Sequence, residues 1–401
     1  MTRSIFNKGY TRQEYYYFII IFWLFLASLN FATRYYYWNY IAFAFFLIAP
    51  TCRIRVNVSS IFLLVLALSM LIFDQNSCNG ITDMIKPFVF LVSYTVGMGL
   101  FTDHNHVEAR IKETERIIYV CAFGALTHYF LNLLLNINSL ERDTIDIWTG
   151  SVMSATGQAS LASMCVGIVA ALLFSDHTRK TKIAAVVLSL VIILYNMILA
   201  GRTLIFMLLI VFVIALFYQR HDKKVKIGKE LLVLFIFGAL LLFIYNLDLF
   251  SIKTSFEQSN FYTRFFGKDG FGLFDDPRLD YKRVYLNHIF DYPFGGTYIR
   301  RAYGFYAHDL YLDTCDQYSI FAGLAIVAYI VSSIIRLVKC LSVPTIPFRT
   351  KQLMLCVYAV MNMQFLVEPI IQGMPTYFVS YCLVDGVITR YLAEQNAELG
   401  D

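Results

Sequence analysis

Apolar runs of membrane-spanning length follow one another along almost the whole chain. A bilayer core about 30 Å thick is crossed by about 20 predominantly apolar residues in a helix. The pattern predicts an all-α polytopic membrane protein with about 12 transmembrane helices, and a single integral membrane domain over residues 1–401. The predicted helices are 15–33, 36–50, 57–73, 84–101, 116–137, 156–174, 183–200, 203–219, 230–247, 318–340, 352–371 and 375–392.

The boundary between the seventh and eighth predicted helices rests on two residues. Gly201 and Arg202 are the only break between two strongly apolar runs. A single helix over both runs would have about 37 residues and would exceed the membrane thickness nearly twofold. We therefore expect two helices.

The distribution of Lys and Arg predicts the orientation. With the N-terminus inside, basic residues gather at both termini and in the even-numbered connections, whereas the short outer connections hold only Arg34, Arg142 and Arg202. This bias marks the cytoplasmic side. We expect a multi-pass protein of the bacterial inner membrane with both termini cytoplasmic. The inner basic residues are Arg3, Lys8, Arg12, Arg53, Arg55, Arg110, Lys112, Arg116, Arg179, Lys180, Lys182, Arg220, Lys223, Lys224, Lys226, Lys229, Arg336, Lys339, Arg349, Lys351 and Arg390.

Composition narrows the function classes. Only 15% of the residues are charged, and 58% are hydrophobic, whereas soluble domains have about 25% charged residues. The excess of 33 Lys and Arg over 28 Asp and Glu is too small to indicate nucleic acid as a partner. The eight cysteines form no CxxC or Cys/His cluster, so we predict no metal and no cofactor.

One outer connection differs from the rest. Residues 248–317 contain no convincing membrane span, and the charge bias places them in the periplasm. The segment is rich in Phe and Tyr, and we expect short amphipathic helices that lie on the outer interface. Its aromatic residues can anchor the protein at the interface, and some can stack on sugars.

Two sets of cations are candidates for an anion site. Arg202 follows Gly201, which would let a phosphate approach the backbone at the start of a helix; the alternative is an arginine that only ends a helix. In the outer loop, Pro277 can begin a helix that carries Arg278 and Lys282 four residues apart, with Arg283 beside them. A salt-bridged surface arginine is the simpler interpretation of Arg278.

Histidine supplies the candidate general base. His308 lies next to Asp309, but neighbouring residues on a helix do not face each other, so Asp313 is the better candidate to orient the ring. His288 in the same loop competes for this role. Asp309, Asp313, Asp316 and His308 cannot all point at one metal ion from a single short helix, so we do not expect a metal site here.

Three further charges lie in or beside predicted spans, namely Lys86, Glu368 and Asp385. Charged residues inside a membrane are costly and are functional candidates by default. Each fits either an internal ion pair or a substrate cavity, and the sequence does not choose between them.

Three motifs around Arg202, Arg278 and His308 together resemble the O-antigen polymerase and O-antigen ligase superfamily of membrane glycosyltransferases. The resemblance covers residues 200–325, where Gly201-Arg202-Thr203, Pro277-Arg278-Leu279 and His308-Asp309-Leu310-Tyr311-Leu312 follow in order. Asp309 stands where the family often has Asn, and Pro277 where it often has Ser or Gly.

The resemblance implies an inverting, metal-independent glycosyl transfer on the periplasmic face. The donor would be an oligosaccharide on undecaprenyl pyrophosphate, with Arg202 and Arg278 on the pyrophosphate and His308 as the base. We expect a polymerase, whose acceptor is a second lipid-linked repeat unit and whose partners include a chain-length regulator and a flippase. The alternatives are an O-antigen ligase that transfers the glycan to lipid A core, a lipid-linked oligosaccharide flippase or other transporter, and a non-enzymatic export scaffold. Transporters often show internal repeats and a midplane site, which this sequence lacks.

Overall fold

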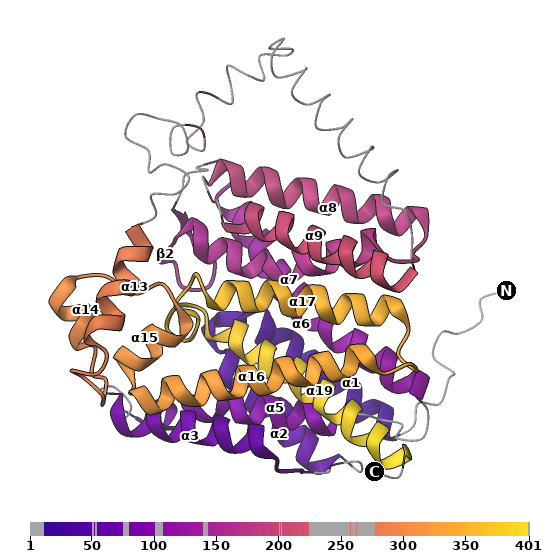
Figure 1. Cartoon of the computed structure of the whole chain (residues 1–401), viewed down its shortest axis with the longest axis horizontal. Coiled ribbons are helices and arrows are strands. Elements are labelled where there is room, and N and C mark those ends of the chain that lie inside the picture. Colours follow the sequence, from indigo (N-terminus) through magenta and orange to yellow (C-terminus); the bar gives the residue numbers. More distant parts are fainter. Residues whose placement is uncertain are drawn as a thin grey trace. The chain divides into compact units, whose positions relative to one another are not determined.

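The computed structural model is built almost entirely of α-helices (Figure 1). The helices group into two compact units, each made of segments that are far apart in the sequence. The structure describes residues 12–49, 52, 54–74, 80–100, 107–138, 143–199, 201, 203–223, 257, 262 and 277–399.

The first unit comprises residues 1–128, 285–346 and 369–401. A close backbone contact joins α5 and α19, where two glycines meet. A Cβ atom on Gly97 would lie 2.3 Å from the carbonyl oxygen of Leu383, and one on Gly386 would lie 2.3 Å from that of Tyr94. Small residues let helix backbones approach closely in this way in membrane proteins. The helices of this unit are α1 (Arg12–Ser28), α2 (Tyr35–Ile48), α3 (Val58–Phe73), α4 (Ile81–Ile85), α5 (Val89–Gly99), the first part of α6 (Val107–Leu135), the end of α13 (Pro277–His288), α14 (Tyr298–Tyr303), α15 (Leu310–Gln317), α16 (Ile320–Ser342), α18 (Ile370–Gly373) and α19 (Pro375–Leu399), with two 3-10 turns at Phe31–Thr33 and Lys86–Phe88.

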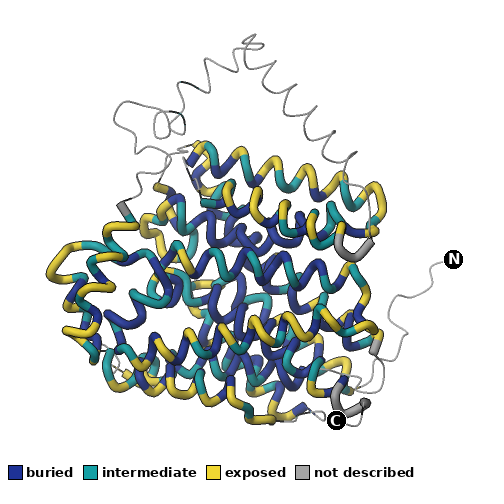
Figure 2. Tube along the Cα trace, in the orientation of Figure 1, coloured by how far each residue is buried: buried dark blue, intermediate teal, exposed yellow. Residues whose placement is uncertain are grey.

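The second unit comprises residues 129–284 and 347–368. Its centre is α7, which is buried along most of its length, whereas α8 is largely exposed (Figure 2). Gly167 of α7 packs against the backbone of α17, because a Cβ there would lie 2.9 Å from the Cys356 carbonyl oxygen. The elements are the end of α6, β1 (Thr144–Ile145) paired with β2 (Val152–Met153), α7 (Ala155–Leu173), α8 (Arg179–Ile198), α9 (Thr203–Lys223), the start of α13 and α17 (Phe348–Phe365).

The helices agree with the apolar runs. Every predicted span in the described part of the chain coincides with a helix, and the ninth, 230–247, lies outside the described residues. The break at Gly201 is confirmed, because α8 ends at Ile198 and α9 begins at Thr203. The run 352–371 is shorter than predicted: α17 ends at Phe365 and Pro369 precedes the separate helix α18, since proline cannot continue a helix.

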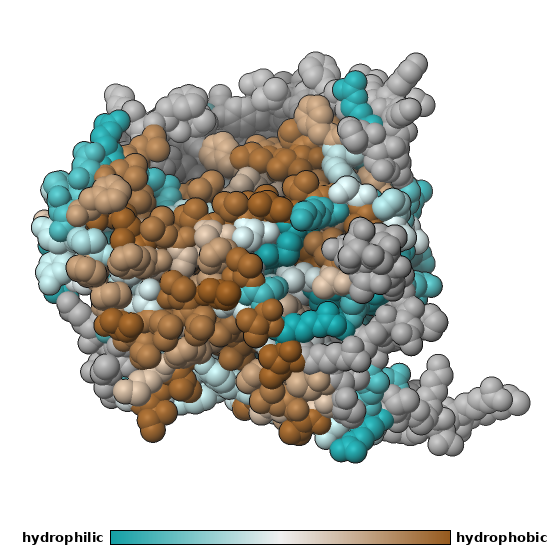
Figure 3. Space-filling view, turned by 60° about the horizontal axis from the view of Figure 1, so that its bottom comes forward, coloured by the Kyte–Doolittle hydropathy of each residue, from teal (hydrophilic) through white to brown (hydrophobic). Residues whose placement is uncertain are grey.

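The surface supports a membrane environment. Figure 3 shows a broad band of apolar side chains with polar groups gathered at its two ends. On α16 alone, exposed apolar residues recur at Leu324, Val331 and Val338, an arrangement that soluble monomers avoid. Among the described residues, six helices are long and apolar enough to cross a membrane. They are Ile81–Gly99, Glu108–Leu135, Ala155–Leu173, Arg179–Ile198, Thr203–Arg220 and Ile320–Ser342. The protein is therefore a membrane-associated all-α protein; the count of 12 spans and the periplasmic loop stay predictions.

Candidate functional site

Helix α13 in the second unit carries a pair of cations that reach the end of α17. Arg278 donates to the carbonyl oxygen of Val367 (3.1 Å) and pairs with Glu368 (3.3 Å), and Lys282 donates to the carbonyl oxygen of Leu366. These carbonyls follow the last turn of α17, where helical partners run out and cations are favoured. Pro277 begins the helix, as predicted. The spacing of four residues thus puts both cations on one face.

Arg283 does not belong to this pair. Its side chain is 76% exposed and lies 3.4 Å from the equally exposed carboxylate of Asp280 on the same helix. An exposed pair of this kind contributes little free energy. The structure therefore separates Arg283 from Arg278 and Lys282, although the sequence placed them together.

Gly201 lies against the amide of Asn196, on the hairpin between α8 and α9. The N–H of Gly201 donates to the Asn196 carbonyl oxygen (2.9 Å), and a Cβ atom on Gly201 would lie 2.5 Å from Asn196 Oδ1. The space that the missing side chain leaves is thus filled by an amide. The prediction that it admits a phosphate has to be corrected at this point. Arg202 lies outside the described residues.

Uncharged polar side chains form a second feature of this unit. Gln364 lies in the last turn of α17, one turn before Glu368. Its amide donates to the hydroxyl of Ser160 on α7. Gln158, also on α7, donates to the hydroxyl of Thr144 in β1 (2.8 Å). Both glutamines are fully buried. Hydrogen bonds between helices satisfy polar groups that an apolar interior cannot solvate.

The C-terminal end of α6 ties the β-hairpin into this polar cluster. Oδ1 of Asn132 accepts from the N–H of Ile147 (2.9 Å), and its amide donates to Asp146 (3.4 Å). Asn136 accepts from the N–H of Ile145 (2.8 Å). None of these residues was predicted as a site residue from the sequence. Asn and Gln inside the apolar runs were the signal that could have revealed them.

The His308 loop lies in the first unit, immediately before α15. His308 has a φ of 54°, in the left-handed region that few non-glycine residues adopt. Asp309 caps α15 by accepting from the N–H groups of Tyr311 (2.9 Å) and Leu312 (3.2 Å). The two oxygens of Asp313 accept from the N–H groups of Ala307 and Asp309, both at 2.9 Å. The carboxyl group of Asp313 therefore holds the unusual backbone of His308 on both sides, and Asp309 caps the helix that follows.

This arrangement changes the predicted role of Asp313. Both of its carboxylate oxygens bind backbone N–H groups on either side of His308, so it fixes the peptide rather than the imidazole ring. Burial raises the pKa of Asp313 to about 7. Gly323 completes the support, because a Cβ there would lie 2.0 Å from Cys315 Sγ; its absence lets α15 pack against α16.

His288 has a carboxylate on its ring. Its Nδ1 lies 2.9 Å from Oδ2 of Asp291, and its Nε2 lies 2.9 Å from the hydroxyl of Tyr303. A carboxylate only accepts, so Nδ1 donates to Asp291, and in the neutral ring Nε2 accepts from Tyr303. Asp291 therefore orients the imidazole ring of His288, and Tyr303 occupies its second nitrogen.

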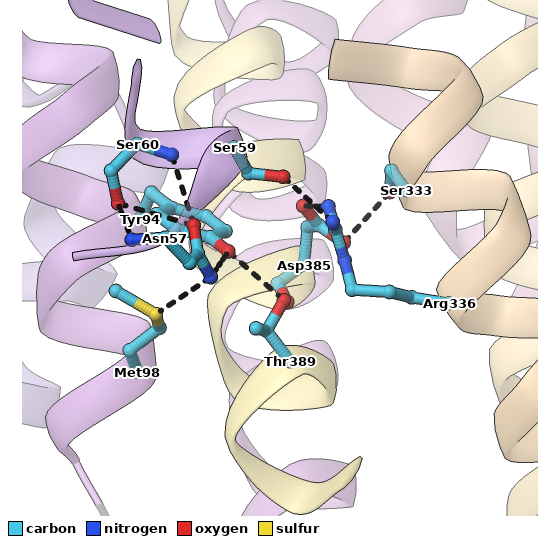
Figure 4. Close-up of polar contacts among 9 residues, drawn as sticks. All are labelled: Asn57, Ser59, Ser60, Tyr94, Met98, Ser333, Arg336, Asp385 and Thr389. Carbon is cyan, nitrogen blue, oxygen red and sulfur yellow. Dashed lines mark hydrogen bonds and ion pairs between the residues drawn. The ribbon is translucent and has the colours of Figure 1, made fainter. Parts of the chain in front are cut away.

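The three isolated charges all have ion-pair partners. Lys86 lies 2.7 Å from Asp83, and Glu368 pairs with Arg278. Asp385 in α19 and Arg336 in α16 point toward each other, as Figure 4 shows. The pairs of Glu368 and Asp385 are largely buried, whereas that of Lys86 is partly exposed.

The surroundings of Arg336 show how its charge is held inside a helix. The charge bias listed it among the inner basic residues, but it lies within α16, as the predicted span 318–340 implies, and its side chain is largely buried. Arg336 donates to Ser59 of α3, and Ser333 donates to Asp385 (2.8 Å), which completes the hydrogen bonding of the pair (Figure 4). A paired charge tolerates burial that an isolated one does not.

Among the described residues, no group of three or more His, Cys, Asp or Glu side chains could hold a metal ion. No protein-family model matches the chain, and no curated protein is significantly similar to it. The fold defines a helical membrane-associated protein.

The close contact at Gly201 makes a testable prediction. We expect Gly201→Ala to lower the thermal unfolding midpoint in detergent, because the new Cβ would overlap the Asn196 amide, at a typical cost of about 1–3 kcal/mol. Asn196→Ala combined with Gly201→Ala should recover most of that loss. Strictly additive effects of the two substitutions would contradict the contact.

The raised pKa of Asp313 predicts a pH-dependent stability. An ordinary Asp has a pKa near 3.8, so the folded state binds the Asp313 proton more tightly than the unfolded state. This favourable contribution is full below about pH 4 and is lost as the pH rises through about 7. We expect Asp313→Asn to gain stability relative to the wild type between pH 5 and 8, measured as unfolding midpoints. Asp280→Asn, on exposed α13, is the control, and a pH-independent difference for Asp313→Asn would refute the assignment.

Proposed function

We propose that the protein is an O-antigen polymerase of the bacterial inner membrane. It joins undecaprenyl-pyrophosphate-linked repeat units on the periplasmic face by inverting, metal-independent glycosyl transfer, with both termini in the cytoplasm. The observation that carries the proposal is the order of three motifs along the chain: Gly201-Arg202-Thr203, then Arg278 and Lys282 on one face of α13, then His308 before α15.

The reaction has a simple atomic balance. The hydroxyl oxygen of the acceptor sugar attacks the anomeric carbon of the donor from the face opposite the pyrophosphate. A new C–O bond forms, the C–O bond to the pyrophosphate breaks, and undecaprenyl pyrophosphate leaves with the electron pair. The acceptor proton passes to His308 Nε2 or Nδ1. Pyrophosphate is a good leaving group, so holding it and stabilising its charge is the main catalytic task.

The cations of α13 suit that task. Arg278 is held by the carbonyl of Val367 and by Glu368, and Lys282 is held by the carbonyl of Leu366. Groups that are already in place stabilise developing charge without reorganisation. We assign Arg202 to the same pyrophosphate from its order in the chain.

His308 suits the role of general base. Asp313 binds the backbone N–H groups of Ala307 and Asp309 on both sides of it, so the imidazole is presented from a rigid support. A positioned base contributes roughly 10²–10⁴-fold to the rate. His288 is the competing base, oriented by Asp291, and it would have to release Tyr303 before accepting a proton.

The O-antigen ladder tests the proposal. In a strain with His308→Ala at the chromosomal gene and confirmed membrane expression, we expect lipopolysaccharide with core plus a single repeat unit. The reason is that polymerisation falls by at least 10²-fold while ligation survives. Arg278→Ala should give the same pattern, and Arg283→Ala, on the exposed side of α13, should keep the full ladder.

Other outcomes separate the alternatives. Loss of every O-antigen band, with polymer accumulating on the lipid carrier, would identify a ligase that acts on lipid A core. Loss of lipid-linked units from the periplasmic face would indicate a flippase. An unchanged ladder for His308→Ala together with a lost one for His288→Ala would transfer the base role to His288.

A further inference from the structure

An open groove lies between α1 and α6 in the first unit. It is lined by Phe25 of α1 and by one side of α6, and its volume is about 540 Å³. The two helices cross just beyond it at Gly124, where a Cβ atom would lie 2.6 Å from Ser28 Cβ. The residues of α6 that line the groove are Lys112, Glu115, Arg116, Tyr119, Val120 and Phe123.

The lining changes from charged to apolar along α6. Lys112 and Arg116 are one turn apart, and Tyr119 and Phe123 continue the same side toward the crossing. Helix α6 has 29 residues, about 43 Å, which exceeds an apolar core of about 30 Å. Its first turns can therefore extend into the headgroup region while Phe123 lies beside the acyl chains.

The charged end of the groove is built to receive an anion. The guanidinium of Arg116 lies over the ring of Tyr17, 5.3 Å from its centre, which holds the arginine in place. Lys112 pairs with Glu108 at 2.9 Å, but both side chains are exposed, so this pair contributes little and can be exchanged. Glu115 is the carboxylate of the described lining; Glu108 beside Lys112 has to give way to a bound anion, and the buried Glu113 faces Tyr17.

We infer that the groove binds an anionic phospholipid, with its phosphate at Lys112 and Arg116 and an acyl chain along Tyr119, Phe123 and Phe25. The occupant follows from the two ends of the groove: the cations select a negative headgroup, and the aromatic side chains select a hydrocarbon tail. The inference does not depend on the proposed enzymatic function.

Native mass spectrometry of the full-length protein in detergent tests this site. The probes are phosphatidylglycerol and phosphatidylcholine with identical acyl chains, and free inorganic pyrophosphate as a competitor. We expect one phosphatidylglycerol to bind in preference to phosphatidylcholine. Lys112→Gln should weaken its binding about fivefold, since one basic residue near the membrane surface contributes about 1 kcal/mol.

Glu115→Gln provides a test in the opposite direction. Removal of this carboxylate from the described lining should strengthen phosphatidylglycerol binding by a similar factor. Lys339→Gln, an exposed lysine near the end of α16, is the matched control and should change nothing. Equal binding of the two lipids, unchanged affinity in both groove variants, or displacement of the lipid by pyrophosphate would each overturn the inference.

Discussion

The ion pair between Arg336 and Asp385 is the interaction on which the first unit depends. Asp385 is fully buried in α19, where an uncompensated carboxylate would be very costly. Arg336 meets it from α16, and Ser59 of α3 accepts from the same guanidinium. One charged pair therefore fixes three helices at a single register, because a shift of any of them would leave a buried charge without its partner.

Helix α16 connects this ion pair to the His308 loop, because it carries both Arg336 and Gly323. Gly323, near the start of α16, lets α15 pack closely through Cys315, and Asp313 of α15 holds the backbone on both sides of His308. In the second unit, buried uncharged groups also find partners on neighbouring elements. Its buried amides pair between helices, as Gln364 does with Ser160, and its charges meet at the end of α17, where Glu368 binds Arg278.

The sequence predicted the helices well because long apolar runs admit few alternatives in a membrane. It predicted the break at Gly201 for the same reason, since one continuous helix would be too long. It included Arg336 in the predicted span 318–340 but did not predict its partner, because no pattern in the sequence pairs position 336 with Asp385 of a different helix. Asp313 was assigned to the imidazole ring, yet it binds the backbone; the left-handed φ of His308 that creates this need has no signature in the residue order.

Purified protein with a synthetic undecaprenyl-pyrophosphate-linked repeat unit as the sole substrate provides the most direct test of the proposed reaction. We predict that two repeat units become joined on one lipid, that one undecaprenyl pyrophosphate is released for each new glycosidic bond, and that the anomeric configuration of the transferred sugar is inverted. The reaction should proceed with chelator present and should fall at least 10²-fold in His308→Ala. Retention of the anomeric configuration, or no new bond unless lipid A core is supplied, would contradict the account.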